Sequence, residues 1–259
     1  MKRLIPIILC SAISACADFS DNMGEKTYPT LDKLAEKIML GYEEDGTETP
    51  EIICSLDYDG KNRLKTVMEH EDSGNTYVTN FMYESNKVIC AQEYMSDGSI
   101  KSYTTIYEFE NGKLQRVTDD EGFTGVFRYN AGVAKPVRYE TNEGTNYKFS
   151  WDNLGNLMTR YEEVAGFGNY SVGYSYSNVQ DKCNVDLRAM IDFEMDGLPL
   201  LFDKGVFKCI SSSNLPNSID NIMYKYEYDS DGYVTKITIL SGDEEHPFLR
   251  ISYRSANQQ

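Results

Sequence analysis

The chain has 259 residues with 25 Lys and Arg against 41 Asp and Glu, which gives a formal net charge of −16. Because phosphate binding needs a basic surface, this charge argues against a nucleic-acid partner. It favours an acidic solvated surface, cationic partners or divalent counter-ions. The 20 Tyr, 11 Phe and single Trp supply enough aromatic area for a sizeable core.

The first fifteen residues have the pattern of an export signal. A basic start at Lys2 and Arg3 precedes an apolar run from Leu4 to Cys10, and small residues follow. The run is shorter than the roughly 20 apolar residues that span a bilayer. Ile13-Ser14-Ala15-Cys16 also resembles the lipobox of bacterial lipoproteins. That resemblance implies acylation of Cys16 and cleavage before it, whereas an ordinary signal peptide cut at a neighbouring alanine is the alternative.

Acylation of Cys16 would make the membrane a partner through the lipid anchor, and two or three acyl chains would hold the protein there permanently. Acidic residues soon after the lipidated cysteine resemble a surface-export signal of lipoproteins in the Bacteroidota, and Asp18 and Asp21 fit this pattern. The resemblance implies the cell-surface side of the outer membrane, with a periplasm-facing lipoprotein as the alternative.

A change of pattern near residue 30 divides a tether from a folded domain. Residues 16–29 are polar and we expect them to form a flexible tether. Leu31, Leu34, Ile38 and Tyr42 then recur at helical spacing, and Thr30 is a suitable N-cap. We therefore predict an amphipathic helix over 30–42 that packs on a single β-rich domain covering 30–259.

From residue 51 onward a short motif recurs: an aromatic or Leu, any residue, an aromatic, then an acidic or polar residue before a turn. The second aromatic falls at Tyr58, Tyr83, Phe109, Tyr129, Trp151, Tyr176 and Tyr228. Alternate apolar residues put one face of a strand against a core. Turn residues follow, such as Asp59-Gly60, Asn111-Gly112 and Asp231-Gly232, and these tolerate the positive φ of tight hairpins.

One period of the motif is a β-hairpin with its connection, which is the mark of repeated, meandering units. We predict an all-β fold of about 14 to 16 antiparallel strands, most of them pairing with sequence neighbours. Because a long open sheet leaves reactive edges, the sheet should curl strongly or close into a barrel.

Residues 178–220 interrupt the repeat. A short helix is predicted over 184–192 with Asn184 or Asp186 as N-cap, and 211–216 has the composition of a loop. We expect this insertion to cover one end or one edge of the sheet.

The repeated motif resembles the tyrosine–aspartate (YD, Rhs-type) repeat, most closely over Tyr226–Ile237 and Leu56–Val67. The order of motifs together with the lipobox is similar to a family of uncharacterised Bacteroidota lipoproteins built on degenerate YD-like hairpins. This resemblance covers about 51–253, and the copies at 81–84 and 127–132 lack the Asp. It implies no activity, cofactor or catalytic residue.

Cysteines and histidines set limits on metal and nucleophile chemistry. Cys54, Cys90, Cys183 and Cys209 permit two disulfides with three connectivities in an oxidising compartment, or they stay buried thiols. None forms a Cys-x-x-Cys pair, so we expect no metal site. The two histidines, His70 and His246, are expected at the surface, and no nucleophile elbow is present.

Acidic pairs are the remaining chemical candidates. Asp57-Tyr58-Asp59-Gly60 and Asp229-Ser230-Asp231-Gly232 look like the start of a calcium loop, but Thr66 and Thr238 occupy the closing Glu position, so turn chemistry explains both. Glu108 with Glu110 and Asp119-Asp120-Glu121 could supply a hydrolase pair. Two carboxylates of raised pKa in one cleft would favour that alternative.

The sequence therefore predicts a cell-envelope lipoprotein that is a non-enzymatic binding or scaffold module without a cofactor. Glycan or protein ligands would suit an exposed strip of tyrosines, although cross-strand ladders and core contacts explain the tyrosines as well. The alternatives are an envelope hydrolase with a carboxylate pair and a purely structural module. No ligand-binding residue is assigned.

Overall fold

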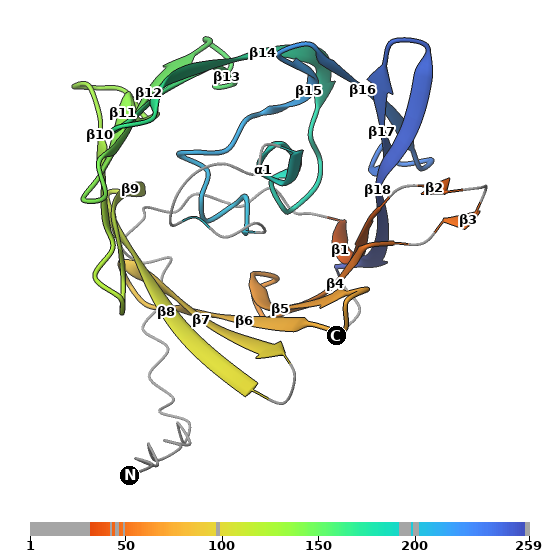
Figure 1. The fold of residues 1–259 in the computed structure, drawn as a ribbon, viewed down its shortest axis with the longest axis horizontal. Coiled ribbons are helices and arrows are strands. Elements are labelled where there is room, and N and C mark those ends of the chain that lie inside the picture. Colours follow the sequence, from red (N-terminus) through yellow and green to blue (C-terminus); the bar gives the residue numbers. More distant parts are fainter. Residues whose placement is uncertain are drawn as a thin grey trace.

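The computed structural model describes residues 32–41, 43–44, 47–48, 50–96, 99–191, 198 and 202–256. Sixteen of the strands found there close into one barrel, in which β1 lies between β18 and β4 and every other neighbour in space is a neighbour in sequence (Figure 1). All the pairings are antiparallel. The closed barrel confirms the predicted all-β meander.

The barrel strands are β1 Lys33–Leu40, β4 Ile52–Tyr58, β5 Leu64–Glu71, β6 Thr76–Tyr83, β7 Lys87–Ser96, β8 Ser99–Glu110, β9 Lys113–Asp119, β10 Thr124–Arg128, β11 Arg138–Thr141, β12 Thr145–Trp151, β13 Leu157–Val164, β14 Gly168–Gln180, β15 Asn214–Ile219, β16 Ile222–Tyr228, β17 Val234–Ser241 and β18 Glu244–Ser255. Two short strands, β2 Glu43–Glu44 and β3 Thr47–Glu48, pair only with each other. The described helix is α1 Leu187–Ile191.

The amphipathic helix predicted over 30–42 is wrong, because Lys33–Leu40 is strand β1. Leu34, Ile38 and Leu40 are buried, and their even spacing satisfies a strand as well as a helix. A bulge between Ala35 and Lys37 adjusts the register where β1 pairs with β18. Pairing on both sides, which closes the barrel, therefore overrides the helical spacing.

The wall of the barrel is apolar inside and charged outside. Along β4, Cys54, Leu56 and Tyr58 are buried, whereas Ser55 and Asp57 between them are exposed. Salt bridges on the outer face link neighbouring strands at Lys87–Glu108, Arg128–Glu140, Lys148–Glu163 and Lys236–Glu227, and Lys225–Glu245 reaches across β17 from β16 to β18. A membrane-spanning barrel presents an apolar outer band instead. The alternation here has the opposite polarity.

The two ends of the barrel differ. We call one the plug end; it carries the turns 59–63, 84–86, 111–112, 152–156 and 229–233, and β14 finishes there while β1 and β15 begin there. We call the other the distal end; it carries the turns 72–75, 120–123, 142–144, 165–167, 220–221 and 242–243. The segment between β14 and β15, residues 181–213, leaves and re-enters the wall at the plug end, and we call it the plug.

The plug lies inside the barrel, where α1 and residues 202–213 cross the lumen (Figure 1). The insertion was expected to cover one end or one edge of the sheet, and it does occupy the plug end, but from inside the lumen (Figure 1). Its short helix is confirmed at Leu187–Ile191. Phe207 of the plug is fully buried and its ring makes edge contacts with Tyr107 and Phe109 at 5.2 and 5.4 Å between ring centroids. Wall and plug therefore share one hydrophobic core.

Turn chemistry at the strand ends explains the aspartate of the repeat. Oδ1 of Asp59 accepts the backbone N–H groups of Lys61 and Arg63, both at 2.9 Å. Asp229 does the same two and four residues ahead, as do Asp119 and Asp152. This confirms the reading of the Asp-x-Asp-Gly segments as turns, because the first carboxylate of each accepts the backbone N–H groups of its own turn.

A bulge accompanies the repeat at the plug end. Register shifts leave one extra residue after Leu64, Leu114, Leu157 and Val234 on the second strand of four hairpins. A bulge interrupts the ladder and frees backbone groups that need other partners. Three Tyr hydroxyls from neighbouring hairpins donate hydrogen bonds to the backbone carbonyls of these bulge residues. They are Tyr83 to Leu64, Tyr129 to Leu114 and Tyr253 to Val234, at 2.6, 2.8 and 2.8 Å.

Candidate functional site

The plug is attached to the wall through the backbone groups that the bulges free. The N–H of Leu64 donates to Oδ2 of Asp203 at 3.1 Å. The N–H of Leu157 donates to the Ser212 hydroxyl at 3.2 Å. The N–H of Leu114 donates to the Cys209 sulfur at 3.4 Å. Three of the four bulged hairpins thus supply a backbone donor for which the plug supplies an acceptor, so the plug completes this part of the hydrogen bonding of the wall.

Asn184 makes the contact that joins the plug to the closing strand. Its Oδ1 accepts the N–H of Ala35 at 2.8 Å, and its Nδ2 donates to the Tyr58 hydroxyl at 2.8 Å. The Tyr58 hydroxyl in turn donates to the Ala35 carbonyl at 2.6 Å. Asn184 is only 3% exposed, so this network is buried where β1 and β4 meet. The residue predicted as a possible N-cap is thus a link between plug and wall.

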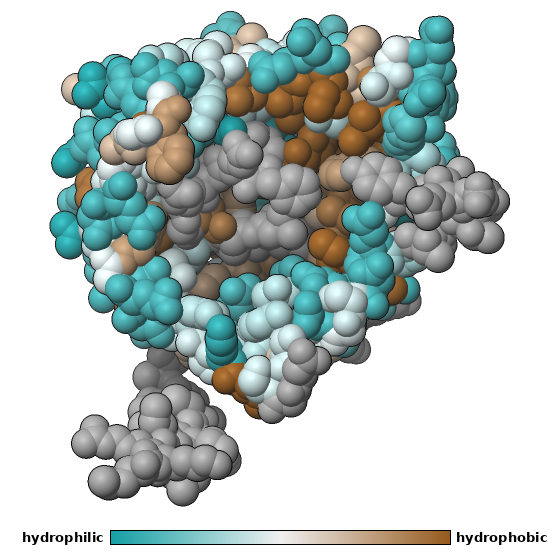
Figure 2. Space-filling model, viewed as in Figure 1, coloured by the Kyte–Doolittle hydropathy of each residue, from teal (hydrophilic) through white to brown (hydrophobic). Residues whose placement is uncertain are grey.

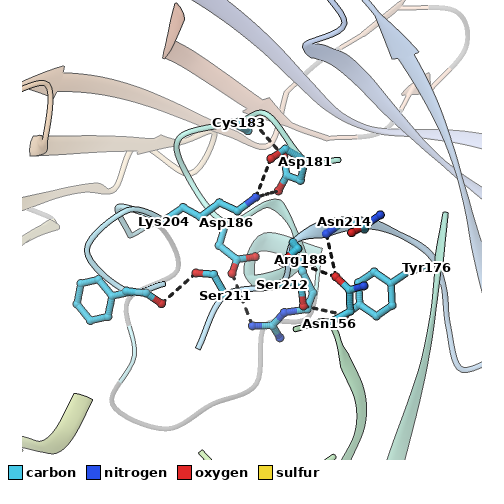
Figure 3. Close-up of polar contacts among 12 residues, drawn as sticks. Asn156, Tyr176, Asp181, Cys183, Asp186, Arg188, Lys204, Ser211, Ser212 and Asn214 are labelled. Carbon is cyan, nitrogen blue, oxygen red and sulfur yellow. Dashed lines mark hydrogen bonds and ion pairs between the residues drawn. The ribbon is translucent and has the colours of Figure 1, made fainter. Parts of the chain in front are cut away.

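Charged groups are buried inside the plug itself (Figure 3). Nζ of Lys204 lies 2.9 Å from a carboxylate oxygen of Asp181, and Asp186 lies 3.8 Å from Arg188. Arg188 also donates to the Ile210 carbonyl at 3.3 Å. Burial raises the pKa of Asp181, and the nearby Lys204 ammonium opposes that rise.

Asn156 and Tyr176 extend the network to the wall beside the plug (Figure 3). Oδ1 of Asn156 accepts the N–H groups of Ser213 and Asn214 at 3.0 and 2.9 Å. The hydroxyls of Tyr176 and Ser212 are 2.9 Å apart. These contacts fix both the path of the chain out of the lumen and the first residue of β15, so the plug end is closed by bonded structure.

The inner wall near the distal end carries polar and aromatic side chains. Register places Glu69 opposite Cys54 on one side and opposite Tyr77 on the other, so it shares the inward face of the buried Cys54. Tyr77 and Tyr94 stack with ring centroids 4.6 Å apart. Burial, and then the neighbouring Glu71, raises the pKa of Glu69 to about 7. This feature could not be found from the motif, because the repeat marks the plug end.

Two of the five carboxylates that the sequence suggested for a hydrolase, Glu108 and Asp119, make structural contacts. Glu108 forms an ion pair with Lys87 on the outer wall at 3.4 Å, and Asp119 caps its turn. Glu71 accepts hydrogen bonds from Ser73 and Asn75, which lower its pKa, while the pKa of Glu69 is raised. The two neighbours therefore do not form the pair of raised carboxylates that would favour a hydrolase.

The cysteines of the barrel are buried, whereas the two histidines lie at the surface. All four cysteines of the barrel are buried free thiols, so of the two alternatives, disulfides or thiols, the structure has thiols: Cys54, Cys90, Cys183 and Cys209. His70 contacts Thr76 at 3.0 Å at the surface, and His246 lies 3.3 Å from exposed Glu244. Among the described residues no group of three or more His, Cys, Asp or Glu is arranged to hold a metal. Cys16 and residues 1–29 lie outside the described part of the chain.

In the part of the chain that the structure describes, no helix has the length and apolarity required to cross a membrane.

Comparison with known proteins identifies the architecture. Neither the protein-family models nor the curated proteins gave a match to the chain. A porin-like protein from Bacteroides vulgatus is similar in structure, with a TM-score of 0.57 and 17% identity over 86% of this chain and 99% of that one. A porin-like protein from Bacteroides uniformis matches with a TM-score of 0.42 and 14% identity over 88% and 99%. At this identity the first likeness shows the fold alone.

Proposed function

We propose that the chain is a lipid-anchored, non-enzymatic binding module of the bacterial outer membrane. In this proposal Cys16 is acylated, the barrel stands in water as a cup, the plug closes its base, and the distal end receives ligand on the side away from the membrane. The cell surface is the favoured location.

The position of the chain entry carries this proposal. Lys33 pairs with Ser255 at the plug end, so the segment that precedes β1 leaves from there. Nζ of Lys33 binds the turn carboxylates of Asp229 and Asp231 at 2.7 and 2.5 Å, which fixes the start of β1 to that end. The sixteen residues 17–32 span at most about 55 Å when fully extended and about 20 Å on average as a flexible chain. Because this tether joins the barrel at the plug end, an anchor on Cys16 favours the orientation with the plug end nearer the membrane than the distal end.

The charged outer wall supports a cup in water over a pore in lipid. Each Lys or Arg side chain at the bilayer midplane of a barrel costs about 2–4 kcal/mol, and the outer face here carries Lys148 and Arg128, paired with Glu163 and Glu140. The plug places buried side chains such as Phe207 and Leu187 in the lumen and closes the plug end. A barrel of this kind holds a ligand at its mouth and does not conduct.

The anchor is tested by replacing the proposed acylation site. Cys16→Ala should move the protein from the membrane fraction to the soluble fraction, and intact-mass spectrometry of the parent protein should show the acyl chains. A parent protein with free Cys16, or a variant that stays in the membrane fraction, would refute the anchor.

Orientation is tested with single thiols at the two ends. Ser73→Cys lies in an exposed distal turn and Lys61→Cys in an exposed plug-end turn, while the four native thiols are buried. A fluorophore at position 61 should be quenched by spin-labelled lipid and one at position 73 should not. The reverse pattern contradicts the proposal. Labelling of position 73 on intact cells reports the cell surface, and labelling only after permeabilisation reports the periplasm.

A further inference from the structure

One row of side chains crosses the inner wall at the distal end. Glu69 on β5 pairs with Tyr77 on β6, Tyr77 with Tyr94 on β7, and Tyr94 with Lys101 on β8. Since paired residues point to the same face of a sheet, all four share the face of buried Cys54, which pairs with Glu69. The row rises from the buried side chain of Cys54 to the exposed side chain of Lys101 at the rim.

A second row lies one step deeper on the same face. Thr79 pairs with Gln92, and Gln92 pairs with Tyr103. Nε2 of Gln92 donates to the Thr79 hydroxyl at 3.2 Å, which orients the amide. Gln92 and Tyr103 are half-buried, as are Tyr77 and Tyr94 above them. We call Glu69, Tyr77, Gln92, Tyr94, Lys101 and Tyr103 the distal wall.

The distal wall is already ordered before any ligand binds. The Tyr77 and Tyr94 rings stack at 26° between planes, so each braces the other. Neighbouring strands lie about 4.7–4.9 Å apart, which makes the row from β5 to β8 about 14 Å long. Such a row presents a carboxylate, two phenols and an ammonium along one line, with an amide and a third phenol beneath.

We propose that the distal wall binds the hydroxyl groups of a neutral oligosaccharide, an inference that rests on the proposed binding function. Hydroxyl groups donate and accept at once, which suits a wall that mixes acceptors, donors and groups that do both. An anionic ligand is disfavoured because Glu69 faces the same space and the distal turns between described strands contain acids such as Asp72 and Glu143 and neither Lys nor Arg. A cationic ligand is disfavoured at the rim by Lys101.

The opposite side of the mouth suits the C–H faces of sugar rings. Val172 on β14 and Ile239 on β17 pair with the buried residues Arg160 and Tyr224, so they face the lumen, and both are half-buried. Figure 2 shows hydrophobic atoms gathered over β15 to β17 and hydrophilic ones over the β5 to β8 side. A ligand with both polar and apolar faces matches this division.

The test uses the mature, lipidated chain in detergent and isothermal titration calorimetry with neutral hexasaccharides: cellohexaose, maltohexaose, xylohexaose and mannohexaose. Hexalysine and hexagalacturonate are the cationic and anionic probes. At least one neutral hexasaccharide should bind. Tyr94→Phe and Tyr103→Phe, which keep the rings and remove one hydroxyl each, should weaken that binding about three- to tenfold.

The matched control is Tyr161→Phe, because Tyr161 lies on the outer wall opposite Lys148 and should leave binding unchanged. The inference is overturned if no neutral hexasaccharide binds, if only hexalysine or hexagalacturonate binds, or if both distal-wall variants bind as the parent does. Such a failure leaves the anchor and orientation experiments unaffected, so the two proposals fall separately.

Discussion

Asn184 is the residue whose loss should most directly loosen the plug. Asn184→Ala removes the acceptor for the buried N–H of Ala35 and the donor to the Tyr58 hydroxyl, each at 2.8 Å. A buried donor left unsatisfied costs about 1–3 kcal/mol, and an ordinary hydrogen bond contributes about 1 kcal/mol. We therefore expect the free energy of unfolding to fall by about 2–4 kcal/mol. Asn80→Ala, on the exposed outer wall, should change it by less than about 0.5 kcal/mol.

Thiol labelling separates an opened plug from an unfolded barrel. Cys183 and Cys209 belong to the plug, whereas Cys54 and Cys90 belong to the wall, and all four are buried. A loss of 2 kcal/mol corresponds to about a 30-fold larger open population, so a maleimide should label Cys183 and Cys209 about 30-fold faster in the Ala variant. Equal labelling rates in variant and parent, or wall thiols that react first, would refute the argument that Asn184 holds the plug.

Three further predictions concern the wall. In urea unfolding, Glu69→Gln should be about 1–2 kcal/mol more stable than the parent at pH 8 and equal to it below pH 4.5. The raised pKa of about 7 means that the folded chain holds the Glu69 proton more tightly than the unfolded chain does, so the parent loses stability as pH rises from about 4.5 to 7, by an amount that the partial exposure of Glu69 reduces. A stability difference that does not change with pH would contradict this prediction. Gly125→Ala should cost about 1–3 kcal/mol because its Cβ would lie 2.2 Å from the Tyr139 hydroxyl, whereas Gly60→Ala, with open space around it, should be neutral in thermal melts. The purified protein should give no conductance steps in planar bilayers, since its outer wall is charged and its plug end is closed; regular steps would argue for a pore.

The strands were predictable because the alternation of apolar residues and the turn residues of the repeat can be recognised within a few neighbouring positions. Alternation of buried and exposed residues, as in Cys54, Leu56 and Tyr58, requires only the two-residue period of a strand. Turns such as Asn111-Gly112, where both residues have positive φ, can be predicted from the residue types. Closure of the sheet into a barrel follows from the number of hairpins, since an open sheet of that size leaves two edges.

The helix and the plug were predicted less well because their placement depends on distant partners. Leu34 and Ile38 are four residues apart, a spacing that fits a strand and a helix equally, and only pairing with both β18 and β4 decides the matter. Phe202 belongs to the insertion that interrupts the repeat, and it packs on Phe207 inside the lumen. An interior segment without strand pairing has no local signature that distinguishes it from an external cover.

The polarity of the wall is set by the side chains and is not fixed by the barrel architecture. The barrel shares its fold with a porin-like protein, as the TM-score of 0.57 shows. A lipid-facing wall places apolar residues outside and polar residues in the lumen. In this chain the register puts Phe149 and Tyr147 inside and Lys148 and Ser150 outside, and the plug then buries the apolar lumen. This polarity of the wall supports the proposed cup that stands in water and binds a ligand at the distal end.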